Sequence, residues 1–115
     1  TFQTVQLATI LRDAAHRQPC DVLVLAGDFN SLRLDRRRWA AWFAARAAEG
    51  FLDASQEVEW TFRSSSLPLR QKLDNALIRG AEGLVCGAHS PELPGSDHLP
   101  LFVSVQLPAT RYPYK

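Results

Sequence analysis

The sequence predicts an α/β domain of the α+β type, in which a mixed and mainly antiparallel sheet carries helices on one face. Three observations predict it. An amphipathic stretch opens the chain, a continuous apolar run follows at residues 21–26, and a second helical stretch leads into short apolar segments separated by loops with Pro or Gly. Helix, strand, helix and then four strands is an order typical of one sheet covered by helices.

Two helices are expected, at residues 2 to about 16 and about 36 to 49. Apolar residues recur at helical spacing in the first, and Pro19 ends it. Asp35 is placed to N-cap the second helix and Gly50 to end it as a C-cap. One face of the second helix carries Trp39, Trp42, Phe43 and Ala47.

The expected strands differ in pattern. The first is apolar throughout, which is typical of a strand buried on both faces. The segment EVEWTFR alternates between polar and apolar residues, as a half-buried strand does. Turn residues separate the later strands. The expected strands are residues 21–26, 57–63, 72–78, 84–89 and 99–107.

Length and charge limit the class of protein. The 115 residues suggest a single domain over 1–115, and the absence of Met together with a start inside a helix suggests a piece of a longer protein. A net charge of +1 gives no general field for a polyanion, so any polyanion must bind a local patch. No apolar run approaches the roughly 18 residues of a membrane span, and no signal-peptide pattern is present. For a bacterial protein, this would favour the cytoplasm.

The two cysteines, Cys20 and Cys86, have no CxxC motif or Cys/His cluster around them. Two small buried thiols are therefore favoured over a disulfide or a metal pair. Both alternatives stay open, and the redox compartment is not indicated.

The most informative motif is Gly27-Asp28-Phe29-Asn30, directly after the first apolar run. If extended geometry persists, Asp28 and Asn30 lie on one side of the chain and Phe29 on the other. Phe29 would then anchor the loop while the polar pair faces a cleft. The alternative is a simple turn, in which both polar side chains bond to the local backbone.

A second motif, Ser96-Asp97-His98, precedes the last apolar run. Asp74 is the natural partner of His98, because it lies in an otherwise apolar strand where an unpaired carboxylate is costly to bury. Such a pair would fix the imidazole tautomer and favour its charged form. The alternatives are an outward-facing Asp74 and an ordinary cap or surface histidine; His16 and His89 are interpreted as ordinary histidines.

The order LAGDFN, KLDNALI and GSDHLPL resembles the C-terminal half of the endonuclease/exonuclease/phosphatase superfamily. This superfamily includes DNase I-like nucleases, apurinic-site endonucleases, inositol polyphosphate phosphatases and neutral sphingomyelinases. The resemblance implies half of a four-layer α/β sandwich, and it implies a parent enzyme that hydrolyses phosphoesters with Mg²⁺ or Mn²⁺.

The resemblance also implies roles for individual residues. Asp28 would orient or deprotonate the attacking water, Asn30 would stabilise the transition state, and His98 would contact the scissile phosphate. Asp74 would orient that imidazole, although Asn75 stands where the family usually has Tyr or His. The catalytic candidates are thus Asp28, Asn30, Asp74 and His98, and the metal candidates are Asp97, Asp28 and Asn30.

The chain lacks positions that the family places upstream: an Asn, the Glu that is the principal Mg²⁺ ligand, and a His or Tyr. Gln3, Gln6, Glu57 and Glu59 cannot be assigned these roles from the sequence. We therefore expect the isolated chain to be inactive or nearly so. The alternatives are a non-catalytic binding or assembly module with the same fold, and an unrelated α/β domain.

The substrate class is open between nucleic acid and a phospholipid or inositol phosphate. Arg33 and Arg70 are the substrate-binding candidates. Because a half-sandwich leaves its inner apolar face uncovered, we also expect self-association or pairing with the missing N-terminal half. The run Arg36, Arg37 and Arg38 is either a solvated helix face or a phosphate contact, and the further basic and aromatic candidates are Arg63, Lys72, Trp60 and Phe62.

Overall fold

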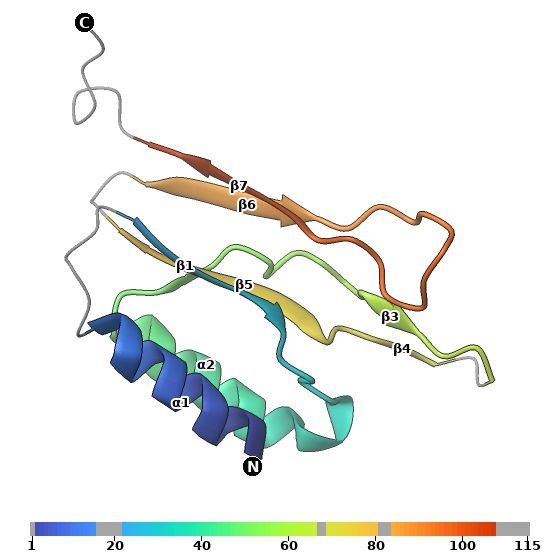
Figure 1. Cartoon of the computed structure of the whole chain (residues 1–115), viewed down its shortest axis with the longest axis horizontal. Helices are drawn as coiled ribbons and strands as arrows, with labels where there is room; N and C mark the ends of the chain where they lie inside the picture. The colour runs from blue at the N-terminus through green and yellow to red at the C-terminus, as the bar shows by residue number, and fades with distance from the viewer. Residues whose placement is uncertain (1, 16–21, 67–68, 81–83, 108–115) are drawn as a thin grey trace, which may run out of the picture.

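Figure 1 shows the computed structural model, which describes residues 2–15, 22–66, 69–80 and 84–107. All strand pairs among these residues are antiparallel. In chain order the elements are α1 (Phe2–Ala15), β1 (Val22–Asp28), the 3₁₀ turn η1 (Arg33–Asp35), α2 (Arg36–Ala48), β2 (Leu52–Asp53), β3 (Phe62–Arg63), β4 (Arg70–Gln71), β5 (Asp74–Gly80), β6 (Val85–His89) and β7 (Phe102–Gln106).

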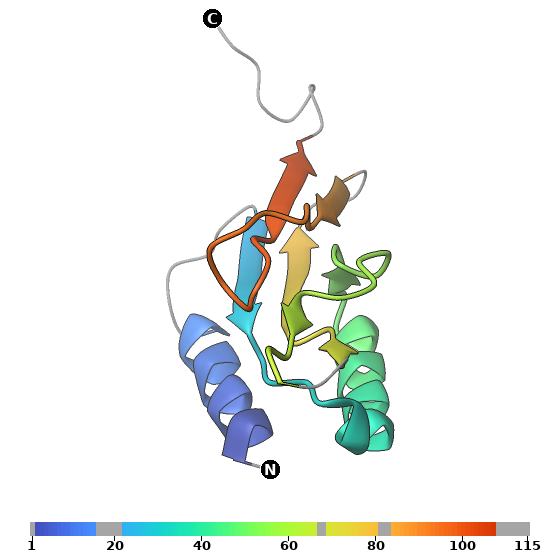
Figure 2. The same ribbon diagram turned by 90° about the vertical axis from the view of Figure 1, so that its right-hand side faces the viewer.

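The molecule has three layers, with the sheet β1-β5-β2 in the middle. Helices α1 and α2 cover one face of this sheet, and the hairpin β6-β7 lies over the other, as Figures 1 and 2 show. The predicted α+β class is confirmed. The expectation of one sheet is wrong, because β3-β4 and β6-β7 form two further two-stranded sheets.

The core on the helix side is built around aromatic rings. Phe29 is buried and stacks on Trp39, with 6.2 Å between the ring centroids. Phe29 and Trp42 pack edge to face, with 5.9 Å between their centroids. The predicted aromatic face of α2 is therefore confirmed, but Ala47 is exposed and does not belong to it. The buried members of this core are Leu7, Phe29, Trp39, Phe51 and Leu77.

The core on the hairpin side changes one expectation about exposed surface. Ala76 and Ile78 on β5 are fully buried, because the hairpin packs over them with Leu101, Val103 and Val105. The inner face of the sheet is thus not generally uncovered. Val24 on β1 remains 47 % exposed, so the prediction of a first strand buried on both faces is wrong at this edge.

Cys86 packs on the same hairpin-side core as a free thiol, which confirms the interpretation of it as a small apolar side chain. Burial, and then the negative charge of Asp53, raise the pKa of this thiol. Cys20 and His16 lie outside the described residues.

The expected strand 57–63 shrinks to Phe62–Arg63, and Leu52–Asp53 forms a strand that the sequence did not predict. The reason is a turn held by Ser55, which is fully buried. Its backbone N–H and its hydroxyl both donate to Asp53 Oδ1, at 3.0 and 2.8 Å. The hydroxyl also accepts the N–H of Ala76 at 3.1 Å, which ties the turn to β5. These local bonds outweigh the strand pattern of residues 57–60.

Helix α2 begins and ends close to the predicted positions, but the predicted capping hydrogen bond is missing. Asp35 occupies the N-cap position, but its side chain makes no capping hydrogen bond. Gly50 follows the C-cap residue Glu49 with φ = 93°, a conformation that favours glycine. In the described residues, neither helix is long and apolar enough to cross a membrane.

Candidate functional site

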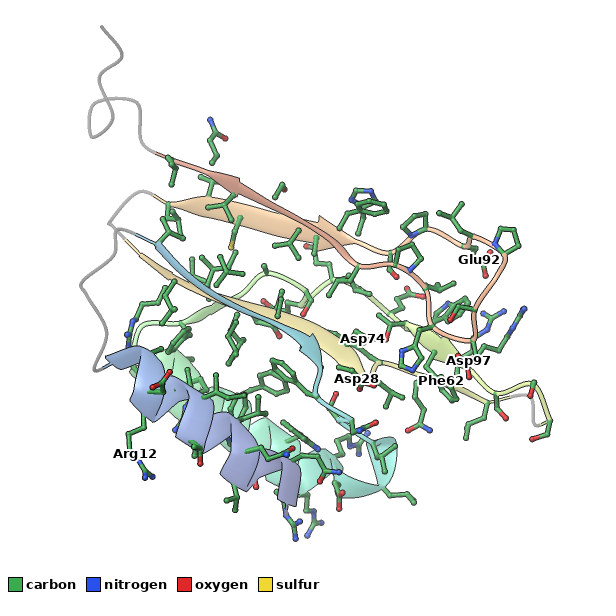
Figure 3. The ribbon with its side chains drawn as sticks, viewed as in Figure 1. Arg12, Asp28, Phe62, Asp74, Glu92 and Asp97 are labelled. Carbon is green, nitrogen blue, oxygen red and sulfur yellow. The ribbon has the colours of Figure 1, made fainter. Side chains whose placement is uncertain are left out.

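The site is built where β1 ends and β5 begins. Asp28 closes β1 and Asp74 opens β5, and the antiparallel register places these two residues directly opposite each other. His98 arrives from the loop before β7 and is held by an isolated bridge to Phe62. Figure 3 shows Asp28 and Asp74 side by side, with Phe62 and Asp97 on the same end of the molecule.

The imidazole of His98 lies between the two carboxylates. Its Nδ1 donates to Asp74 Oδ2 at 2.8 Å, and its Nε2 is 3.8 Å from Asp28 Oδ2. The second separation is too long for a hydrogen bond, so Nε2–H is left for another acceptor. The side chain of Asp74 is only 15 % exposed, whereas those of His98 and Asp28 are 34 % and 42 % exposed. The predicted Asp74–His98 pair is confirmed.

The surroundings raise the pKa of His98 above its ordinary value of 6.5. The largest cause is the hydrogen bond to Asp74. Burial acts in the opposite direction, and the charges of Asp74, Asp28 and Asp97 add to the upward shift. The site therefore favours a charged imidazolium whose free N–H points away from Asp74.

The motif at the end of β1 follows the predicted alternation. Phe29 is buried in the helix-side core, and Asp28 and Asn30 are exposed. The turn alternative also holds in part, because the N–H of Asn30 donates to Asp28 Oδ1 at 2.8 Å. Asn30 has φ = 51°, a left-handed conformation that Asn tolerates better than most residues. Asp28 is thus oriented through one oxygen, and its other oxygen faces His98.

Polar groups of Thr61 and Ser96 support the site. Thr61 is fully buried and was not predicted from the sequence, whereas Ser96 is exposed and belongs to the motif that contains His98. Thr61 Oγ1 accepts the N–H groups of Leu73 and Asp74, both at 3.0 Å, and the Thr61 carbonyl accepts the N–H of Leu99 at 2.6 Å. Ser96 Oγ accepts the N–H of His98 at 3.1 Å. The signal that marks Thr61 is a hydroxyl between two aromatic residues directly before β3, which sequence patterns do not distinguish from an outward-facing threonine.

Asn75, whose role beside Asp74 was open, is buried and connects β5 to the loop after Asn30. Its Nδ2 donates to Ser31 Oγ at 2.9 Å, and Ser31 Oγ donates to the carbonyl of Lys72 at 2.8 Å. The loop that follows the GDFN motif is therefore fixed to the strand that carries Asp74.

Asp28, Asp74 and His98 form the one group among the described residues whose Asp, Glu, His or Cys ligand atoms approach closely enough for a metal ion, within 4.8 Å of one another. Mg²⁺ prefers an octahedral set of oxygen ligands. Here one of three donors is an imidazole, which cannot ligate when charged, and Asp74 already accepts its hydrogen bond. Asp97 is exposed and lies outside this group. The cluster alone fits a carboxylate–imidazole pair better than a magnesium centre.

Two of the basic residues predicted to contact a ligand make contacts within the protein. Lys72 donates to the carbonyl of Ser55, and burial lowers its pKa despite the charge of Asp53, so it supports the fold rather than facing a ligand. Arg70 lies over the ring of Trp60 at 4.6 Å. The side chain of Arg33 lies outside the described part of the structure.

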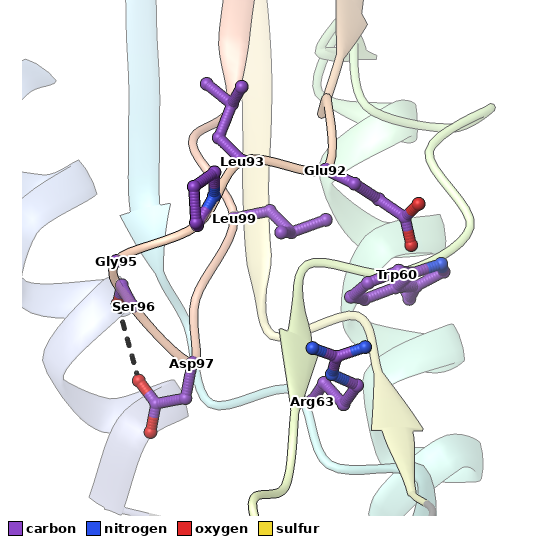
Figure 4. Close-up of a pocket in the computed structure, with 9 residues that line it drawn as sticks. Trp60, Arg63, Glu92, Leu93, Gly95, Ser96, Asp97 and Leu99 are labelled. Atoms are coloured by element: carbon purple, nitrogen blue, oxygen red, sulfur yellow. Dashed lines mark hydrogen bonds between the residues drawn. The ribbon is translucent and has the colours of Figure 1, made fainter.

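A groove of about 470 Å³ opens next to the cluster, between the 92–97 loop and the β3 region. Figure 4 shows Trp60 and Arg63 on one side and Ser96 and Asp97 on the other. Asp97 connects the groove to the site, because it lines the groove and directly precedes His98 in the chain. Its carbonyl accepts the N–H of Arg63, on the other side of the groove, at 3.0 Å. The groove thus joins an aromatic ring and a guanidinium to the segment that carries His98.

A second hollow, of about 450 Å³, lies on the α1 side of Asp28 and Asn30. Gln3 and Gln6, which the sequence could not assign, line it together with Val5. Asp28 thus lines this hollow and also approaches His98.

This geometry places an exposed carboxylate beside the imidazole of His98, which is an arrangement suited to attack on an ester by water. No protein-family model matches the chain, and no curated protein or solved structure matches it either. The superfamily resemblance therefore stays a prediction, and the function is argued from the site.

Proposed function

We propose that this chain is the C-terminal catalytic part of a phosphoester hydrolase that uses an activated water. The observation that carries the proposal is the imidazole held between two carboxylates, with Asp74 on Nδ1 and Asp28 facing Nε2. A charged imidazole next to a free carboxylate supplies a donor for a phosphoryl oxygen and a base for water. This arrangement favours catalysis over binding alone, because it combines an imidazole of raised pKa with an exposed carboxylate base.

The roles follow from which atoms are free. Asp28 Oδ2 would accept a proton from water as the water oxygen attacks phosphorus, and the bond from phosphorus to the leaving oxygen breaks. His98 would donate from Nε2 to a phosphoryl oxygen and stabilise the developing charge. Asn30 would offer its amide to the same group. Asp74 is a positioning residue, because it holds His98 and is too buried to meet substrate.

The resemblance also implies Mg²⁺ or Mn²⁺. Asp28 is the carboxylate of the cluster that is free of the imidazole hydrogen bond, so it is the residue of this chain that would hold the ion. The remaining ligands would come from outside the Asp28–Asp74–His98 cluster. Activity is then a property of the longer parent protein, and Asp97 stays a candidate metal-associated residue of that assembled site.

The test is hydrolysis of bis-p-nitrophenyl phosphate by the full-length protein with Mg²⁺, with the 115-residue chain assayed in parallel. We expect Asp28→Ala and His98→Ala to lower the full-length rate to the level of buffer, and EDTA to do the same. Glu57→Ala, which changes an exposed acid that does not line the groove, serves as the matched control. Full activity in both site variants would rule out Asp28 and His98 as catalytic residues, and no metal-dependent hydrolysis by the unmodified full-length protein would favour the binding-module alternative.

We further infer that the open edge of β1 pairs with another strand, from a second copy or from the missing half. Within the described residues β1 pairs only with β5, and Val24 beside this edge is 47 % exposed. Unpaired strand edges are templates for strand addition. Size-exclusion chromatography of the 115-residue chain is expected to show self-association, and a monomer across the accessible concentration range would contradict this inference for the isolated chain.

A further inference from the structure

The segment between β1 and α2 combines exposed leucine with exposed arginine. Leu34 in η1 is 96 % exposed and Leu32 is 37 % exposed. Arg36, Arg37 and Arg38 follow in the first turn of α2 and are all exposed. Residues 34–38 line a hollow of about 610 Å³. We call residues 32–38 the leucine–arginine tip.

Both features of the tip are unfavourable for the chain in water. Three arginines at a helix N-terminus oppose the helix dipole, which favours negative charge there. Asp35 at the N-cap is the one acid of the tip, so the three arginines outnumber it, and within the described part of the chain no ion pair involves these arginines. Leu34 gains nothing from burial. Adjacent residues that break local rules in this way are typical of a functional surface.

The tip is held in place by backbone and side-chain bonds. The N–H of Leu32 donates to the carbonyl of Asn30 at 2.8 Å, and the N–H of Asp35 donates to the carbonyl of Leu32 at 3.0 Å. Ser31 connects the start of the tip to β5. A hydrogen-bonded turn therefore holds Leu34 in its exposed position.

The tip also lies on the side of the molecule that carries the candidate site. Figures 1 and 2 place η1 and the start of α2 at the end where β1 terminates. Asn30 of the site is four residues before Leu34 in the chain. A surface that binds the tip would thus face the carboxylate of Asp28.

We propose that the leucine–arginine tip docks on the anionic surface of a phospholipid bilayer. Leu34 enters the boundary of the acyl chains, and Arg36, Arg37 and Arg38 contact headgroup phosphates. An aliphatic residue beside basic residues fits a lipid interface. A nucleic-acid strand would favour aromatic stacking partners, and the hollow at the tip is lined by none. The proposal does not rest on hydrolysis, and it favours lipid phosphoesters among the possible substrates.

The experiment is co-sedimentation of the 115-residue chain with vesicles of phosphatidylcholine alone or mixed with phosphatidylserine. We expect binding to the mixed vesicles and little to phosphatidylcholine. Since each basic residue near such a surface contributes about 1 kcal/mol, the variant R36Q/R37Q/R38Q should bind about 100-fold more weakly. Leu34→Ser should lower binding about tenfold or more through lost apolar burial.

Matched control variants distinguish binding through the tip from a general effect of charge or apolar surface. Arg12→Gln removes an exposed helix arginine at the opposite end of the molecule (Figure 3), and Val85→Ser removes an exposed apolar residue on β6. Both should bind like the unmodified chain, whereas Arg37→Gln alone should bind about fivefold more weakly. Equal losses in controls and tip variants would overturn the proposal. So would absence of vesicle binding, or binding of a labelled oligonucleotide in place of vesicles through the same arginines.

Discussion

Replacing Thr61 by valine is expected to destabilise the protein by about 2–4 kcal/mol, although the two side chains have nearly the same shape. Thr61 is fully buried, and its hydroxyl accepts the N–H groups of both Leu73 and Asp74. Valine leaves both donors without an acceptor, and each buried donor left unpaired costs about 1–3 kcal/mol. The expected loss is smaller than the sum of two full penalties, because Asp74 is only half-buried.

Urea unfolding followed by circular dichroism measures this loss. Thr61→Ser is the matched control, because it keeps the hydroxyl and removes one methyl group, worth about 1 kcal/mol. Because Thr61 bonds to the backbone of Asp74, the valine variant should also lower the pKa of His98, which histidine NMR detects. A valine variant as stable as the serine variant would show that the two backbone groups find other partners.

The parts of the site that could be predicted depend on local pattern and on the cost of buried charge. Strand alternation predicts that Asp28 and Asn30 are exposed and Phe29 is buried, and the structure shows this burial pattern, although Asn30 lies in a left-handed turn after β1 has ended. The Asp74–His98 pair follows from the expense of a lone carboxylate in an apolar strand. The neighbours of Asp74 indicate that its carboxylate needs a partner, and the nearby motif Ser96-Asp97-His98 supplies the candidate, 24 residues away in the chain.

The parts that could not be predicted depend on which distant groups meet. The strands β6 and β7 are apolar whether they extend the main sheet or pack over it, so their pattern does not reveal that they bury Ala76 and Ile78. Lys72 is a candidate ligand contact from the sequence, but in the structure its ammonium group donates to the carbonyl of Ser55 in the turn. The same turn, through Asp53, replaces most of the strand expected at residues 57–63.

Replacing Asp74 by asparagine is expected to lower the pKa of His98 toward 6.5 and to slow the proposed phosphoester hydrolysis by about 100-fold or more. The hydrogen bond to Asp74 is the largest cause of the raised pKa, and its charge adds to the shift. Asparagine keeps the size of the side chain but removes the charge that stabilises the imidazolium. Positioned acid–base groups contribute about 10²–10⁴-fold to rates, and misorienting His98 should remove much of its share.

The sign of the pH dependence distinguishes this role from simple packing. Because the folded-state pKa of His98 is raised, the stabilisation from the pair is complete below the ordinary value of 6.5 and is lost as pH rises through the folded-state value. The stability difference between the unmodified chain and Asp74→Asn should therefore shrink as pH rises through that value. Histidine NMR titration gives the pKa directly, with His98→Gln identifying the signal. If the pKa in Asp74→Asn is unchanged, or the stability difference is constant over this range, Asp74 does not act through the charge of His98.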